Sequence, residues 1–525
     1  MKLLLPVAED IDRMRRTLLK LAVAGTGMQL GGALAWAATR PYAADRDTLV
    51  IGVDKNFASL NGVIAGTGDS DRYGLQVFDK LYTFDAAGLP TPELATAVDI
   101  SADGLRYTYH LRRGVKFQNH RELTSADVKF TMEFALDPIN RSARRPFFAP
   151  SVDGVETPDP YTAVFRLKIA DAAFANKIAG YLPILPKDYG SSQPAGDFFA
   201  RSPIGAGPYR VKSFSTDNET LELERFDDYW GPKPSIRRLV FKTLKDEGNR
   251  VNALLAGEVD VVVGVPYQDF ARLQNNANVT AVTNPAAAPF IARPFANDPK
   301  LPYYKREVRQ ALNYAIDKDA IVKSVLHGIG EPLASGISRY YPYGSDSRIK
   351  PYPYDPKRAR ELLTQAGFAN GFDTQLIISS ENPRALAEAV AAYWGQVGVR
   401  AKIQVVDYAS WVARNNTHMA GPVTIQQVAN AIYDPIHPVT GLYSKGGSWS
   451  DYSNPEIEQL LTKLSNTPDR QQRDLLFQRI DDILHDDAAA IYISEILRVY
   501  ARKRTLQWAP TRGTAALDFR KAAWS

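Results

Sequence analysis

Short stretches of the chain have apolar residues at every second position or in nearly continuous runs, and both patterns predict β-strands. The clearest alternation spans residues 105–111. Nearly continuous apolar runs at 48–53, 259–265 and 489–493 are typical of buried strands. We therefore expect at least one sheet whose strands lie inside the protein.

Between these strands, apolar residues recur three and four positions apart, which predicts amphipathic helices. Ser125 is expected to cap a helix that buries Val128 and stops before Pro138. Another helix, around residues 251–255, is expected to end at Gly257, because glycine readily adopts the left-handed conformation that closes a helix.

Three further helix starts are indicated by a residue before proline, at Asp355-Pro356, Asn454-Pro455 and Thr467-Pro468. The first of these helices is expected to end at Gly367. Strands and helices thus follow one another throughout the chain, which predicts a mixed α/β protein with more than one sheet.

The first forty residues resemble an export signal. The pair Arg15-Arg16 precedes a weakly apolar run at 21–38, as in a twin-arginine (Tat) signal peptide. A small-x-small tripeptide predicts cleavage before Ala38, so that residues 1–37 are removed; Ala43-Ala44 is the alternative site. The competing interpretation is an uncleaved membrane anchor, since about 18 apolar residues can just span a bilayer.

Length and composition indicate a soluble globular protein of more than one lobe. The 525 residues exceed the size at which one hydrophobic core stops growing. Hydrophobic residues make up 45% and charged residues 23%, without any low-complexity tract. The formal net charge of +5 is spread along the chain, so the sequence offers no basic stripe for nucleic acid.

The chain contains no cysteine. This excludes disulfides, thiolate metal ligands, cysteine nucleophiles and a lipid-modified N-terminal cysteine. We therefore expect an exported protein without a lipid anchor, located in the periplasm.

Five groups of motifs occur in the order typical of one protein family. They are PELATAVDISADGLRYTYHLRRGVKF at 92–117, continuing to LTSADV at 123–128; IGAGPY at 204–209; YWGPKP at 229–234 with ALLAGEVD at 253–260; VRQALNYAIDKD at 308–319; and YDPKRARELL at 354–363. Together they resemble the bacterial extracellular solute-binding proteins of family 5, which serve peptide, nickel and related ABC importers. The motifs form turns and scaffold, so they identify the fold and say little about the solute.

The resemblance implies a two-lobed α/β fold of the periplasmic binding proteins, type II, with hinge strands between the lobes and an extra subdomain in the first lobe. On that analogy, residues 45–290 and 485–525 form lobe I, with the subdomain at about 91–205, and residues 291–484 form lobe II. A solute held between the lobes would favour the closed state, because contacts to both lobes exist only there. Partner permease and ATPase subunits are implied, since the chain has no phosphate-binding loop of its own.

The same resemblance suggests where the solute is bound. The segment after the first strand matches the family's first ligand loop, and we expect Asn56, Phe57 and Asn61 to line the cleft. Arg293 falls where the chain should cross between lobes, and its guanidinium could clamp a carboxylate, with a structural ion pair as the alternative.

The most informative segment is 427–438, which resembles the loop that supplies an aspartate to the ligand ammonium in peptide-binding members. Here Asn430 or Ala431 occupies that position, so the usual counter-charge is missing. Asp434 could replace it, or could serve only as a turn residue before Pro435. Tyr433 belongs to the same candidate set. Two tryptophans complete the set as possible stacking walls or as core residues: Trp411 and Trp449.

The expected function is therefore capture of a small polar solute, a peptide or peptide-like compound, by a monomeric protein without a cofactor and without catalysis. Binding of a nickel chelate, an opine or a sugar by the same fold is the alternative, with His418 and His437 as candidate metal ligands. A periplasmic hydrolase is a weaker alternative, because the sequence contains neither His-Glu-x-x-His nor Gly-x-Ser-x-Gly.

Overall fold

The computed structural model describes residues 46–55, 60–63, 68–188, 203–215, 219–427, 430–511 and 516–525, with the backbone alone described for residues 68–72. The chain divides into two units, Met1–Ala43 and Ala44–Ser525, and all described residues belong to the second. The predicted signal peptide lies outside the described residues. In the part that is described, no helix is both long and apolar enough to cross a membrane.

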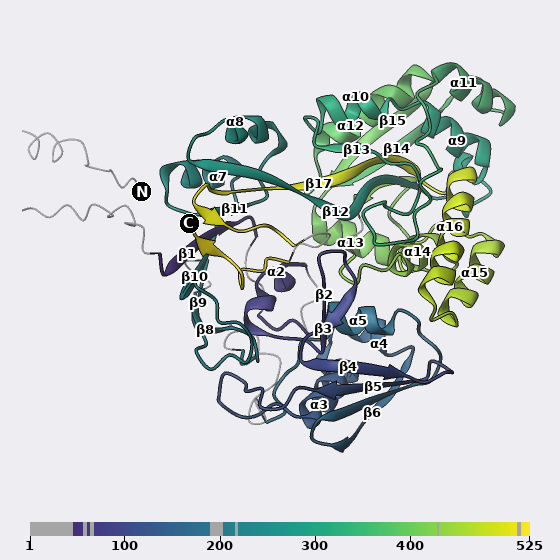
Figure 1. Ribbon diagram of the computed structural model, residues 1–525. Helices are drawn as coiled ribbons and strands as arrows, with labels where there is room; N and C mark the ends of the chain where they lie inside the picture. The colour runs from purple at the N-terminus through teal and green to yellow at the C-terminus, as the bar shows by residue number, and fades with distance from the viewer. Residues whose placement is uncertain are drawn as a thin grey trace, which may run out of the picture. The chain divides into compact units, whose positions relative to one another are not determined.

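The largest sheet of the described residues has eleven strands and can be followed in Figure 1. Its order is β15-β14-β16-β12-β17-β11-β1-β10-β9-β8, and β13 lies beside β17. The bounds are β1 (Thr48–Val53), β8 (Tyr209–Ser215), β9 (Thr220–Arg225), β10 (Arg238–Thr243), β11 (Val261–Val263), β12 (Val279–Pro294), β13 (Gly330–Pro332), β14 (Phe372–Ser379), β15 (Val399–Val406), β16 (Val423–Gln427) and β17 (Ile491–Lys503).

The two longest strands, β12 and β17, connect the two ends of this sheet. They pair antiparallel from Val279 opposite Lys503 to Ala292 opposite Ile491, with register shifts between Ala286 and Ile291. β17 also pairs with β11, and β12 also pairs with β16. The irregular pairing therefore lies where the strands pass from one set of neighbours to the other. The predicted lobe boundary at residue 290 falls within this irregular stretch.

A separate four-stranded antiparallel sheet has the order β4-β5-β7-β6. Helices α3 (Ser125–Leu136) and α5 (Phe174–Tyr181) share its hydrophobic core. A two-stranded sheet of β2 (Tyr82–Phe84) and β3 (Pro90–Pro92) precedes it. The strands of the four-stranded sheet are β4 (Ala95–Ile100), β5 (Arg106–Leu111), β6 (Val152–Asp159) and β7 (Thr162–Leu167).

The helices contribute to separate hydrophobic cores. Helices α9 to α12 share a core with β12 and with β14 to β16, whereas α14 to α16 share another with residues of β12 and β17. The remaining bounds are α2 (Gly68–Val77), α4 (Arg145–Phe148), α7 (Glu247–Ala256), α8 (Phe270–Gln274), α9 (Arg306–Tyr314), α10 (Lys318–Ser324), α11 (Pro356–Gln365), α12 (Arg384–Gln396), α13 (Tyr408–Asn416), α14 (Ile436–Tyr443), α15 (Pro455–Ser465), α16 (Arg470–Asp486), β18 (Leu506–Gln507) and β19 (Ala523–Trp524).

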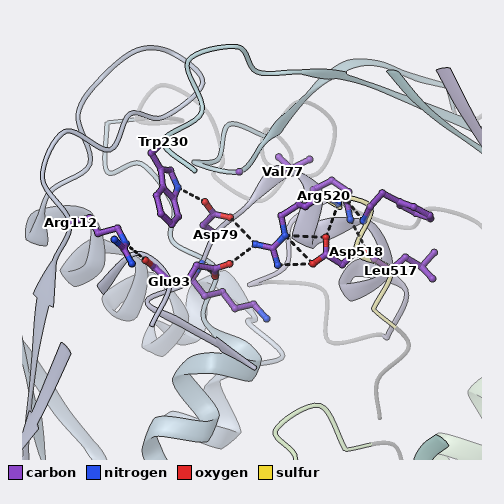
Figure 2. Close-up of polar contacts among 12 residues, drawn as sticks. Val77, Asp79, Glu93, Arg112, Trp230, Leu517, Asp518 and Arg520 are labelled. Carbon is purple, nitrogen blue, oxygen red and sulfur yellow. Dashed lines mark hydrogen bonds and ion pairs between the residues drawn. The ribbon is translucent and has the colours of Figure 1, made fainter. Parts of the chain in front are cut away.

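A network of charged side chains attaches the end of the chain to this framework, as Figure 2 shows. Arg520 donates to Glu93 Oε1 at 2.7 Å and to Asp518 Oδ2 at 2.8 Å. Trp230 Nε1 donates to Asp79 Oδ2 at 2.6 Å. Burial, with the nearby charge of Glu93, raises the pKa of Asp79 well above its ordinary value. The network therefore links the C-terminal segment to residues at both ends of the β2–β3 hairpin.

Several predicted helix ends are confirmed. Asp355 and Asn454 cap α11 and α15 through their side chains, and Gly257 ends α7 with a φ of 81°. Two caps are wrong. Thr124, not Ser125, caps α3, because Thr124 and Asp127 form a reciprocal capping box.

The other wrong cap is the one predicted at Thr467-Pro468. α16 begins later, at Arg470, because the Asp469 side chain accepts the backbone N–H of Gln472.

The lengths of two strands differ from the apolar runs that predicted them. The run at 259–265 forms only the three residues of β11, whereas the run at 489–493 continues into the much longer β17.

Candidate functional site

The segment Asn430–His437 follows β16 and leads into α14. The Asn430 side chain holds this segment in a turn through two hydrogen bonds. Its Nδ2 donates to the carbonyl of Asp434 at 2.7 Å, and its Oδ1 accepts from the N–H of Ile432 at 3.0 Å. Tyr433 adopts a φ of 52°, the left-handed conformation of a tight turn. Asn430, Tyr433 and Asp434 are all almost completely buried. The segment is a compact loop, and its three candidate side chains are directed into the protein.

Asp434 is fully occupied by neighbours within the protein. Its Oδ2 accepts from Arg473 at 2.7 Å and from the Tyr343 hydroxyl at 2.6 Å, while its Oδ1 accepts from the N–H of Ile436 at 2.9 Å. Asp434 and the Arg473 side chain are 0% and 5% exposed. The charge of Asp434 is therefore compensated inside the fold and is not available to a ligand ammonium group.

The Asn430–His437 segment packs against elements early in the chain. The ring of Tyr433 lies 4.6 Å from that of Phe84 in β2, measured between centroids. Asn176 in α5 donates to the carbonyl of Ile432 at 2.8 Å. His437 lies against Phe147, and burial lowers the pKa of His437 to about 4. This imidazole is neutral at physiological pH and has a packing role.

A second group of candidates surrounds Arg293 on β12. Its guanidinium pairs with Asp451 and donates to Asn415 in α13, and all three side chains are buried. Burial lowers the pKa of Arg293 to about 10. The same helix carries Trp411, whose carbonyl accepts from the Asn415 amide. Arg293 thus has the structural ion pair that the sequence left open as an alternative.

The two candidate tryptophans contact each other. The rings of Trp411 and Trp449 meet edge to face, with centroids 5.5 Å apart, and Tyr408 stacks on Trp411 with centroids 6.2 Å apart. Trp449 is partly exposed and donates to Asn416 Oδ1 at 2.6 Å, whereas Trp411 is buried. These rings form one aromatic wall, of which Trp449 and Tyr408 are the solvent-accessible parts.

The first predicted ligand loop is described only in part. Asn56 and Phe57 lie outside the described residues. Asn61 is buried, and its Oδ1 accepts from the N–H of Val63 at 2.9 Å, a contact that shapes the turn. Lys55, which follows β1, forms an ion pair of 2.9 Å with Glu381, which follows β14. This pair joins the residues just after β1 to those just after β14, two strands that are not neighbours in the main sheet.

Sequence reasoning missed several buried polar residues beside the candidates. Gln426 precedes the selected segment by a few positions, and Tyr341 and Tyr443 come from a loop and from α14. β16 has the sequence Val-Thr-Ile-Gln-Gln, so no local pattern indicates that Gln426 is buried. Tyr341 and Tyr443 had no local signal either.

The described residues contain no group of three or more metal-ligating side chains that could hold an ion. Of the two candidate histidines, His437 is packed as described above, and His418 Nδ1 lies 3.4 Å from Asp451 Oδ1. Some surface pockets also lie away from the candidates, including one of about 850 Å³ beside Tyr303 and Arg400.

Comparison with known proteins supplies the context for this arrangement. A family described as "Bacterial extracellular solute-binding proteins, family 5 Middle" matches residues 90–450. The chain is 28% identical to the glutathione-binding protein GsiB of Pectobacterium atrosepticum, over 90% of this chain and 93% of that protein. It is 30% identical to heme-binding protein A of Haemophilus influenzae, over 80% and 81%.

A solved structure shares the fold over nearly the whole chain. The periplasmic binding protein DppA of Helicobacter pylori, in complex with the peptide STSA, superposes with a TM-score of 0.80 at 25% identity. The match covers 91% of this chain and 98% of that one. The expected two-lobed α/β fold is thereby confirmed.

Proposed function

Because the chain belongs to the bacterial extracellular solute-binding proteins of family 5, we propose that it captures a peptide or peptide-like solute between two lobes and delivers it to the permease of an ABC importer. The glutathione-binding and peptide-bound relatives support this class of solute. The proposed lobes are residues 45–290 with 485–525, and residues 291–484.

One observation carries the proposal. The Asn430–His437 segment of the proposed second lobe contacts β2 and α5 of the proposed first lobe through Phe84 and Asn176. Contacts of this kind exist only when the lobes are together, and a bound solute adds to them, which is the physical basis of ligand-driven closure. The Lys55–Glu381 ion pair supports the same arrangement at another point.

We further propose that the protein is exported by its twin-arginine signal, cleaved before Ala38 and released into the periplasm as a monomer. The absence of cysteine from the chain supports release without a lipid anchor. Replacing Arg15 and Arg16 by lysine is expected to retain the precursor inside the cell, and mass spectrometry of the exported protein tests the cleavage site.

The binding function is tested with a panel of di- to tetrapeptides, glutathione, haem, an opine, a sugar and a nickel–histidine complex. Thermal unfolding and tryptophan fluorescence are measured for the exported protein. A true ligand at about 100 times its Kd stabilises the folded state by roughly 2.7 kcal/mol. The proposal fails if every compound leaves the melting temperature unchanged, whether or not one of them is hydrolysed.

A further inference from the structure

Four buried side chains, Arg293 among them, have polar atoms without a hydrogen-bond partner among the described residues. They are Nε2 and Oε1 of Gln426, Nε of Arg293, the hydroxyl of Tyr443 and Nε1 of Trp411. The exposed fractions are 0%, 3%, 1% and 4%. These four residues form the Gln426 cluster.

The sheet register places members of this cluster on one face. Gln426 in β16 lies opposite Ile291 in β12, so their side chains leave the sheet on the same side. Arg293 is two residues further along β12 and therefore shares that face. Tyr443 packs in the same hydrophobic core as Ile291, and the charge of Arg293 acts on its hydroxyl. Asn415 accepts from Arg293 and donates to the backbone carbonyl of Trp411, one turn earlier in α13.

Such a concentration of unpaired polar atoms is costly in a protein interior. Each buried donor or acceptor without a partner costs about 1–3 kcal/mol, and a leucine at position 426 would avoid the cost of two. Buried polar groups in folded proteins nearly always have partners. Trp411 also belongs to the aromatic wall with Trp449, and Gln426 precedes the Asn430–His437 segment. A bound solute is the partner that suits this position.

The charges near the cluster are already compensated. Arg293 is paired with Asp451, and Arg473 is paired with Asp434. Burial raises the pKa of Asp481, whose charge also acts on Tyr443, to about 7, and its carboxyl oxygens accept the backbone N–H groups of Ile337 and Asp346. An ammonium or carboxylate group entering here would find no free counter-charge, and its desolvation would not be offset.

The unpaired atoms are mainly donors. The indole and guanidinium N–H groups and the amide NH2 donate only, the tyrosine hydroxyl can donate or accept, and the single obligate acceptor is the Gln426 carbonyl oxygen. The complementary group is therefore uncharged and rich in oxygen acceptors. On the basis of the proposed function, we infer that the Gln426 cluster binds an uncharged amide or hydroxyl group, so that solutes without a free ammonium or carboxylate at this end are preferred.

The test compares four forms of one dipeptide, alanyl-phenylalanine: free, N-acetylated, C-amidated, and blocked at both ends. Trehalose is added as an uncharged hydroxyl compound, and affinities are measured by calorimetry. We expect the doubly blocked peptide or trehalose to bind at least tenfold more tightly than the zwitterionic dipeptide. Binding of trehalose without binding of any peptide would identify the bound group as a hydroxyl. Binding of a blocked peptide without binding of trehalose would identify it as an amide.

The variant Gln426→Leu tests the cluster directly. It is expected to weaken binding of the preferred uncharged probe about tenfold, because one or two hydrogen bonds are lost. The melting temperature of the ligand-free variant should stay constant or rise, because a buried amide without a partner is removed. Gln427→Leu is the matched control, since neighbouring residues of a strand face opposite sides.

Tighter binding of the zwitterionic dipeptide, or binding of only charged compounds from the wider panel, would overturn the inference and leave the proposed function intact. Unchanged affinity in Gln426→Leu would also overturn it, by assigning the glutamine a structural role. If no compound of either panel binds, the proposed function itself fails.

Discussion

The carboxylate of Asp434 and the guanidinium of Arg473 are bonded at 2.7 Å in the interior of the protein. They are 39 residues apart in the sequence and connect the Asn430–His437 segment to the first turn of α16. Tyr343 donates to the same carboxylate oxygen. Asp434, a candidate ligand residue in the sequence, thus holds its own loop in place.

Removing one partner of this pair should destabilise the protein strongly. Asp434→Asn leaves the buried Arg473 without its counter-charge, and we expect a loss of about 3–5 kcal/mol of unfolding free energy. The double variant Asp434→Leu with Arg473→Met should recover much of this loss. Urea unfolding measures both. Glu388→Gln, in an exposed pair with Arg384, is the control and should change stability by less than about 1 kcal/mol.

The contact between Gly180 and the Asn430–His437 segment allows a test of lobe closure. A Cβ on Gly180 would lie 2.7 Å from the carbonyl oxygen of Ala431 and 2.8 Å from Ile432 Cγ2. Gly180→Ala should therefore force α5 and the segment apart, weakening solute binding about tenfold at the usual cost of overpacking. If the lobes separate without ligand, the melting temperature should change little.

The matched control for this prediction is Gly74→Ala in α2, where a Cβ meets nothing within 4 Å. It should leave affinity unchanged and should stabilise the helix slightly. If Gly180→Ala instead lowers the melting temperature of the ligand-free protein strongly, α5 and the segment belong to one rigid part and the proposed lobe boundary is wrong.

The network around Arg520 should respond unequally to two neutralising changes. Arg520→Met removes the cation that faces Glu93 and Asp518, and we expect a loss of about 3–5 kcal/mol. Asp79→Asn should cost less than about 1 kcal/mol, because its raised pKa favours a neutral carboxyl that the amide resembles. Chemical unfolding at pH 7 compares them; equal losses would show that Asp79 is ionised in the folded protein.

Glu495 should make stability depend on pH. Burial raises its pKa from an ordinary 4.5 to about 7, so between these values the folded state binds more protons than the unfolded state. Stability therefore falls as the pH rises through this window, by on the order of 3 kcal/mol for a shift of this size. Glu495→Gln can keep the bonds to Ser338 and to the N–H of Arg339, and its stability should fall less.

Unfolding free energies measured from pH 4 to pH 8 compare the unchanged protein with Glu495→Gln. Glu388→Gln, a change at an exposed position, is the control. Some slope should remain in Glu495→Gln, because burial also raises the pKa of Asp481 to about 7. A profile parallel to that of the unchanged protein would show that Glu495 is ionised throughout the window.

The sequence by itself determined which elements form, and the family. Apolar spacing and local turn residues act over a few positions, so β5, the end of α7 at Gly257 and the cap of α11 at Asp355 were predictable. The misplaced caps at Ser125 and Thr467 have the same cause, because a capping side chain one or two positions away competes for the same N–H groups.

Only the tertiary structure decided what the candidate side chains do. Arg293 and Asp451 are 158 residues apart, and the pairing that neutralises them depends on how β12 and the segment after α14 meet. The pairing of Asp434 with Arg473 also depends on the tertiary structure, and so does the position of Gln426 opposite Ile291 in the sheet. The energy of a buried charge or amide depends on its surroundings in space, and no local pattern in the sequence contains those surroundings.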